Sequence, residues 1–134
     1  MIEVLLQNGQ TMLTSPVLPE GKNNLLIDID GTITDDVPNE RTDLMSVVQP
    51  YEGAVEKINE YYSAGHIITF FTSRTDEHRV VTLEWLNRHG FKFHQLLMNK
   101  PRGGNYYWVD NHLVKGIRYS NWNQLKFGDL FKSS

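Results

Sequence analysis

The 134-residue sequence contains no cysteine. This absence excludes disulfide bonds and thiolate metal sites, and it suits a reducing cytoplasm. No apolar run approaches the roughly 18 residues that a membrane-spanning helix needs. The N-terminal segment MIEVLLQNGQ lacks the basic start and the long apolar centre of a secretion signal. We therefore expect a cytoplasmic protein that does not associate with membranes.

The composition that is present favours a folded globular domain, because 40% of the residues are hydrophobic. The net charge of −3 is unevenly distributed. Residues 1–66 carry 11 acids and 3 bases (net −8), whereas residues 67–134 carry 5 acids and 10 bases (net +5). The acidic half can supply metal ligands and the basic half can supply contacts to anions.

The most informative stretch is LLIDIDGTIT, residues 25–34. Its apolar residues predict a buried strand that ends in two acids, Asp28 and Asp30. Side chains two positions apart on a strand point the same way, so the two carboxylates can share one site. Gly31 then allows the backbone to turn. The alternative is an ordinary hairpin turn entered through Asp-Gly.

The rest of the chain alternates apolar runs with segments of helical periodicity. Strands alternating with helices predict an α/β, Rossmann-like single domain with a mostly parallel central sheet flanked by helices. The elements expected after the first strand are a helix over 51–64, a strand over 67–71, a helix from a capping box at Ser73 and Asp76 to Gly90, a strand over 95–98 and a strand over 106–109.

Two segments fall outside this alternation. Residues 1–24, interrupted by Pro16, Pro19 and Gly21, indicate an N-terminal strand or arm preceding a main domain over 25–134. The polar stretch 33–49 has no clean period and directly follows the acid pair. We interpret it either as a mobile flap over the site or as a connecting loop.

Each expected strand is followed by a polar residue suited to chemistry: Asp28, Thr72, Lys100 and Asp110. Ligands of parallel α/β sheets bind beyond the carboxyl ends of the strands, so these residues predict one site. Carboxylate oxygens without cysteine or clustered histidine favour Mg²⁺. A hydroxyl donor near a helix start and a lysine would then bind a phosphoryl group.

These motifs resemble those of the haloacid dehalogenase-like superfamily of phosphatases. LLIDIDGT matches its first motif, FFTSR the second, Lys100 the third, and WVDN lies where the fourth belongs. The resemblance implies that Asp28 is the nucleophile and forms an aspartyl phosphate, and that Asp30 is the general acid and base. Thr72 and Lys100 would hold the transferring phosphoryl group.

The resemblance also implies a Mg²⁺ site made by Asp28, the Asp30 backbone carbonyl and Asp110. Asn111 stands where family members often carry a second acid; it keeps an oxygen acceptor and loses the charge. Ser73 joins the predicted phosphate-binding set, as does Arg74, which could contact a second anionic group of the substrate. A structural salt bridge is the alternative for Arg74.

The spacing between motifs leaves no room for a cap domain. Capless relatives act on large substrates or as oligomers whose neighbouring subunits roof the site, so a homo-oligomer is one expectation. GHIITFFTSR and KPRGGNYYWVDN also resemble small phosphatases of capsule and surface-sugar synthesis. We expect a Mg²⁺-dependent phosphatase of a small phosphorylated metabolite, with a nucleotidase or polynucleotide-end phosphatase and a non-catalytic binding module as alternatives.

Overall fold

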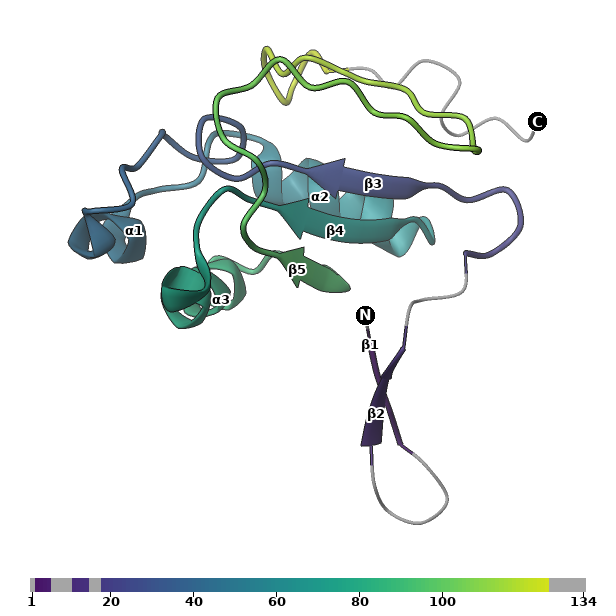
Figure 1. Ribbon diagram of the computed structural model, residues 1–134, viewed down its shortest axis with the longest axis horizontal. Coiled ribbons are helices and arrows are strands. Elements are labelled where there is room, and N and C mark those ends of the chain that lie inside the picture. Colours follow the sequence, from purple (N-terminus) through teal and green to yellow (C-terminus); the bar gives the residue numbers. More distant parts are fainter. Residues whose placement is uncertain (1, 6–10, 15–17, 126–134) are drawn as a thin grey trace.

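A three-stranded parallel sheet forms the centre of the domain (Figure 1). The computed structural model describes residues 2–5, 11–14 and 18–125. The strands β3 (Asn24–Ile27), β4 (Ile67–Phe71) and β5 (Gln95–Leu97) lie in the order β3-β4-β5. This arrangement confirms the predicted α/β class with a parallel sheet.

The helices lie on the sheet as the strand–helix alternation predicts. The helix α2 (Ala54–Ser63) lies behind β3 and β4 in Figure 1. The helix α1 (Thr42–Val47) contacts α3 (Arg79–Arg88), which is preceded by a short 3-10 turn, η1 (Asp76–His78). Each crossover connection carries the chain from the carboxyl end of one strand back to the amino end of the next. The carboxyl ends of the three parallel strands therefore lie together at one edge of the sheet.

The core is continuous across the sheet and its helices. On β3 the buried residues Leu25 and Ile27 alternate with exposed ones, which leaves Asp28 and Asp30 on the opposite side of the backbone from Ile27. On β4 the first four residues are all buried, as expected for a central parallel strand. Residues from both helical layers complete the core: Ala54, Ile58, Tyr61, Trp85 and Leu86.

The predicted strand over 106–109 is wrong. No strand forms there, and Tyr107 and Val109 are each 96% exposed. Residues 101–118 are all exposed and run out along the sheet and back again in Figure 1. The apolar letters YYWV satisfied the pattern for a buried strand, but the segment does not hydrogen-bond to β3 as a ladder.

Two smaller predictions also fail. The predicted capping box at Ser73 is absent, because the helical region starts after Thr75 and no side chain caps it. The stretch 33–49 contains the helix α1, which the sequence pattern did not reveal.

The N-terminal arm forms its own small sheet. The strands β1 (Ile2–Leu5) and β2 (Thr11–Thr14) pair antiparallel and are not part of the central sheet. Within the described ranges, every helix is too short or too polar to cross a membrane.

Candidate active site

The Lys100 ammonium and the Asp28 carboxylate meet at the carboxyl edge of the sheet. Lys100 Nζ lies 3.2 Å from Asp28 Oδ1, although 72 positions separate the two residues. The Lys100 side chain is 14% exposed and that of Asp28 32% exposed. The pair is thus partly shielded from water and still reachable by a small anion.

The turn after Asp30 supplies a hydrogen-bond donor to Asp28 Oδ2, the oxygen that Lys100 does not contact. Gly31 adopts φ +81°, and its N–H donates to the Thr34 carbonyl at 2.8 Å. This left-handed turn suits glycine and brings Thr32 back toward the strand end. The Thr32 hydroxyl then donates to Asp28 Oδ2 at 3.1 Å. Asp28 is therefore oriented by one contact on each oxygen.

Backbone hydrogen bonds between the ends of β4 and β5 place Lys100. The Thr72 N–H donates to the Leu97 carbonyl at 2.9 Å, and the Lys100 N–H donates to the Thr72 carbonyl at 2.9 Å. Between them, Asn99 adopts φ +65° and its N–H donates to the Arg74 carbonyl at 2.8 Å. These bonds extend the pairing beyond the strands and direct residue 100 toward β3.

The predicted phosphate-binding residues next to Lys100 have different settings. Thr72 is fully buried, and its hydroxyl oxygen accepts the Arg74 N–H at 3.1 Å. The hydroxyl hydrogen is then left for a second partner. The Ser73 hydroxyl instead lies 3.5 Å from the Pro101 carbonyl oxygen, at the outer side of the same loop.

Arg74 forms a buried salt bridge with Asp30. Arg74 Nη2 donates to Asp30 Oδ1 at 2.8 Å and Nε donates to Oδ2 at 3.0 Å. The Arg74 side chain is only 1% exposed and that of Asp30 16% exposed. The structure thus shows the salt-bridge alternative for Arg74 and not a guanidinium open to a second anionic group.

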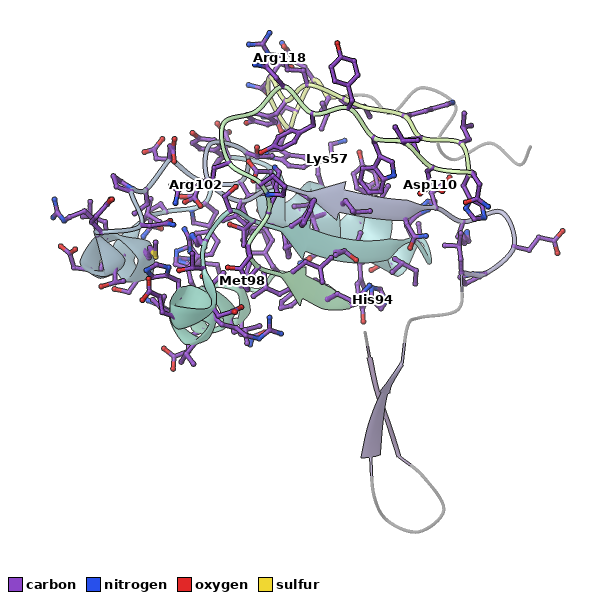
Figure 2. All side chains as sticks on the ribbon, viewed as in Figure 1. Lys57, His94, Met98, Arg102, Asp110 and Arg118 are labelled. Atoms are coloured by element: carbon purple, nitrogen blue, oxygen red, sulfur yellow. The ribbon has the colours of Figure 1, made fainter. Side chains whose placement is uncertain are left out.

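Asp110 is not brought to the other acids. In Figure 2 it lies at the amino-terminal end of β3, whereas Arg102 lies at the carboxyl end. The His112 N–H, the Trp108 indole and the His112 ring hold the Asp110 carboxylate and lower its pKa to about 2. Asn111 belongs to the same exposed stretch. The predicted grouping of Asp110 and Asn111 with Asp28 is absent because their strand does not form.

The acids at the strand end fit a magnesium ion only in part. Among the residues described, no three His, Cys, Asp or Glu side chains form a group that could hold a metal ion. Mg²⁺ is often bound by one or two carboxylates together with substrate phosphates and waters. Asp28 and the Asp30 carbonyl can supply that smaller donor set, and a bound phosphoryl group would supply more oxygens.

Sequence reasoning missed three contacts that shape the site. The Val37 N–H donates to Asp30 Oδ1 at 3.3 Å, and the Arg74 guanidinium donates to the Thr82 hydroxyl at 3.0 Å. The Trp122 indole donates to the Thr32 carbonyl at 2.6 Å. Of these contacts, only that of Thr82 could have been suspected from the sequence, because Thr82 is a polar residue within the apolar face of a helix. The other two contacts depend on how distant loops pack.

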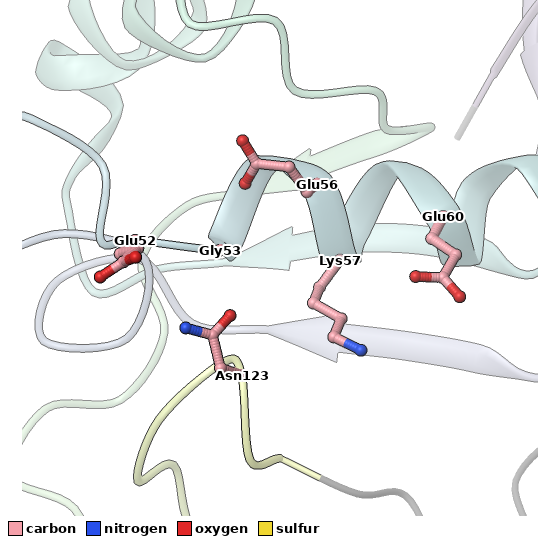
Figure 3. A pocket seen from close by; sticks show the side chains of 6 residues that line it. All are labelled: Glu52, Gly53, Glu56, Lys57, Glu60 and Asn123. Atoms are coloured by element: carbon pink, nitrogen blue, oxygen red, sulfur yellow. The ribbon is translucent and has the colours of Figure 1, made fainter.

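Two surface pockets lie away from this edge. One, of about 330 Å³, is lined by Glu56, Lys57 and Glu60 of α2 and by Asn123, which lies across from Lys57 in Figure 3. The other, of about 320 Å³, lies along β5 and includes Arg79. Neither contains Asp28 or Lys100.

Known proteins resemble this chain at the level of fold and family. A crystal structure of a structural-genomics target from Vibrio cholerae shares 22% sequence identity with it, at a TM-score of 0.56. The likeness covers 81% of this chain and 93% of that one, and it supports the fold. No curated protein matches the sequence.

The family comparison covers the domain that carries the site. The model of the LNS2 domain of PITM 1-3 matches residues 25–118, which is more than half of the chain. This range begins at β3 and includes Asp28, Asp30, Thr72 and Lys100. The chain therefore belongs to the LNS2 domain family and has the haloacid dehalogenase-like fold of phosphatases.

Proposed function

We propose that the chain is a Mg²⁺-dependent phosphomonoester hydrolase that forms an aspartyl phosphate on Asp28. The observation that carries this proposal is the 3.2 Å contact between Lys100 Nζ and Asp28 Oδ1 at the carboxyl edge of the sheet. A lysine beside a partly exposed carboxylate is suited to hold an anionic substrate against its nucleophile. The Thr72 hydroxyl, next to the same edge, supplies a hydrogen-bond donor.

The chemistry has two steps. An Asp28 oxygen attacks phosphorus, the bond between phosphorus and the ester oxygen breaks, and Asp30 gives its proton to the leaving alkoxide. Asp30 then takes a proton from water, whose oxygen attacks phosphorus and releases inorganic phosphate and the Asp28 carboxylate. Lys100 and Thr72 contact the equatorial oxygens in both steps.

A magnesium ion would be held by Asp28 and the Asp30 carbonyl, and it would offset the repulsion between the anionic nucleophile and the substrate. From the sequence resemblance we keep Asp110 and Asn111 as proposed further ligands, which requires residues 101–118 to move. Ser73 stays a proposed contact at the rim, whereas the buried Arg74 is left out of the substrate contacts.

A sugar phosphate is the substrate class that we propose, on the resemblance of GHIITFFTSR and KPRGGNYYWVDN to surface-sugar phosphatases. The open edge accepts a small metabolite or the end of a larger molecule. We retain a cytoplasmic location and a homo-oligomer that covers the edge as parts of the proposal. A panel of sugar phosphates, mononucleotides and 3′-phosphorylated oligonucleotides separates the substrate classes, and a steep salt dependence would indicate the polymer.

The decisive experiment measures phosphate release from an aryl phosphate with Mg²⁺, with a chelator, and by the Asp28→Asn variant. We expect release only with Mg²⁺ and the native Asp28. Hydroxylamine trapping should recover an acyl phosphate from the wild type and none from Asp28→Asn. Release that survives both the chelator and the substitution would rule out the proposed mechanism.

A second function is favoured by the salt bridge of Asp30 and by the distance of Asp110. A binding module with this edge could bind a phosphomonoester and release it unchanged. Its Asp30 carboxylate is already paired with Arg74, and few metal ligands from the described part of the chain lie near Asp28. Calorimetric binding of an aryl phosphate without turnover over hours would support this module. Hydrolysis dependent on Asp28 would exclude it.

A further inference from the structure

Asp30 is the most constrained carboxylate at the strand end. Both of its oxygens accept from one guanidinium, Oδ1 from Arg74 Nη2 at 2.8 Å and Oδ2 from Nε at 3.0 Å. Two parallel hydrogen bonds from a planar donor fix the plane of the carboxylate as well as its position. A single ammonium in place of the guanidinium would fix only one oxygen.

A third contact narrows what Asp30 can still do. The Val37 N–H donates to Oδ1 at 3.3 Å. An ionised carboxylate offers about four lone-pair positions. Arg74 and Val37 use two on Oδ1 and one on Oδ2, so one acceptor position remains, and it is on Oδ2. Proton exchange with a substrate or a water therefore has one place to occur.

Arg74 is itself fixed from the helical layer. Its Nη1 donates to the hydroxyl of Thr82, a fully buried residue on α3, at 3.0 Å. Its backbone is held by the Thr72 hydroxyl and by the Asn99 N–H. A chain of contacts thus runs from α3 through the guanidinium to Asp30, and no member of it except Asp30 needs to reach the substrate.

Stability alone is a weak reason for this arrangement. Burying a guanidinium and a carboxylate costs solvation free energy, and apolar replacements of buried ion pairs are often equally stable. What the pair provides beyond stability is a fixed direction for the free Oδ2 position. Misplacing a reacting group by about 1 Å can cost on the order of 100-fold in rate.

We propose that Arg74 is a positioning residue for Asp30 and that Thr82, acting through Arg74, sets the orientation of the guanidinium. The proposal rests on the hydrolase function given above, in which Asp30 donates and accepts the proton. Arg74 and Thr82 do not contact the substrate. They act on the rate of the proton-transfer steps and leave substrate binding unchanged.

The test compares three threonine variants. Thr82→Val keeps the shape and removes the hydroxyl, and we expect kcat to fall about 3- to 10-fold with KM within about 2-fold. Thr82→Ser restores the hydroxyl and should return kcat to near the wild-type value. Thr69→Val is the matched control, because Thr69 is also a buried threonine, bonded to Gln95 on the neighbouring strand at 3.2 Å. Its kcat should not change.

A readout without turnover accompanies the kinetics. In the wild type the Arg74 Nε–H proton, held by Asp30, should exchange slowly with solvent in an NMR experiment. Thr82→Val should speed this exchange, and Thr82→Ser and Thr69→Val should not. Arg74→Lys should lower kcat by about 100-fold; if it fails to fold, the threonine series and the exchange rate still decide.

The outcomes separate the two proposals. Turnover by the wild type with an unchanged kcat in Thr82→Val overturns the positioning role alone. The same holds if Thr82→Val changes KM and leaves kcat intact. Absence of turnover by the wild type overturns the hydrolase and the positioning role together. An Asp28-dependent wild type with the selective loss of kcat in Thr82→Val supports both.

Discussion

Lys100 is the residue whose charge the proposed phosphate site depends on most directly. Its ammonium contacts Asp28 and lies 4.8 Å from the centre of the Tyr106 ring. The Lys100→Met variant keeps much of the side-chain volume and removes the charge. We expect kcat/KM for an aryl phosphate to fall about 100-fold, since one oxyanion contact is lost. Lys92→Met, at an exposed lysine, is the control and should match the wild type.

Gly53 is a residue at which backbone strain and packing can be separated. It adopts φ +84°, and a Cβ placed there would lie 2.6 Å from Asn123 Oδ1. Gly90 has φ +82° with nothing near its Cβ position. Gly90→Ala should cost about 1 kcal/mol of unfolding free energy from strain alone. Gly53→Ala should cost more in urea unfolding, and equal costs would show that Asn123 moves aside freely.

At the scale of elements, β4 and the approach to β5 are joined by a histidine. The Ile68 N–H donates to His94 Nδ1 at 3.0 Å, and burial lowers the pKa of His94 below its ordinary value of 6.5. Burial and the charge of Lys22 also lower the pKa of His66. As pH falls below about 6.5 the unfolded chain binds protons that the folded chain does not, so the fold loses stability toward the lower folded pKa values.

Urea unfolding at pH 7.5 and pH 5.5 checks this expectation. The unfolding free energy should be smaller at pH 5.5. His94→Asn keeps an acceptor for the Ile68 N–H and does not titrate in this range, so it should reduce the difference between the two pH values. An unchanged difference in His94→Asn would place the pH dependence elsewhere.

The C-terminal loop supports the turn that follows Asp30. Trp122 is 2% exposed, and its indole donates to the Thr32 carbonyl. Trp122→Phe removes the donor and keeps an aromatic ring, so it should cost about 1 kcal/mol of unfolding free energy. Trp108→Phe, at a half-exposed ring, should cost less than about 0.5 kcal/mol of unfolding free energy. Urea unfolding of both variants measures the two losses. Equal losses would argue against a role for the indole N–H.

At the scale of the whole molecule, residues 101–118 form a long exposed segment without helix or strand. Chymotrypsin should therefore cut first among Tyr106, Tyr107 and Trp108, before any site in the sheet. Mass spectrometry of the first fragments checks the position. Slower cutting with Mg²⁺ and a phosphate mimic is expected if Asp110 joins the metal site. Unchanged cutting would leave Asp28 and the Asp30 carbonyl as the protein ligands.

The sequence predicted the parts of this molecule that depend on local patterns. Leu25 to Ile27 and Ile67 to Phe71 are short apolar runs, and they lead to the edge where Asp28 and Thr72 lie. The strand over 106–109 had the same local pattern and failed, because a strand also needs a partner edge and a covered face. The residue types within a segment do not show whether a partner strand or a covering layer is present.

The contacts within the site were less predictable. Lys100 could be placed because it follows a strand in a parallel sheet. Whether Arg74 binds a substrate anion or Asp30 could not be predicted. The outcome depends on how deeply the guanidinium is buried and on its contact with Thr82 of α3. Val37 contributes through its backbone, which leaves no trace in residue type.

The indole contact of Trp122 spans 90 positions and ends on the loop beside Asp28. A nascent chain leaving the ribosome would expose β3 and the two aspartates that follow it long before this tryptophan emerges. The sheet could assemble during synthesis, but the loop next to Asp28 would gain its final support only after Trp122 has emerged. Premature termination upstream of residue 122 should thus give a folded sheet with a poorly ordered loop beside Asp28.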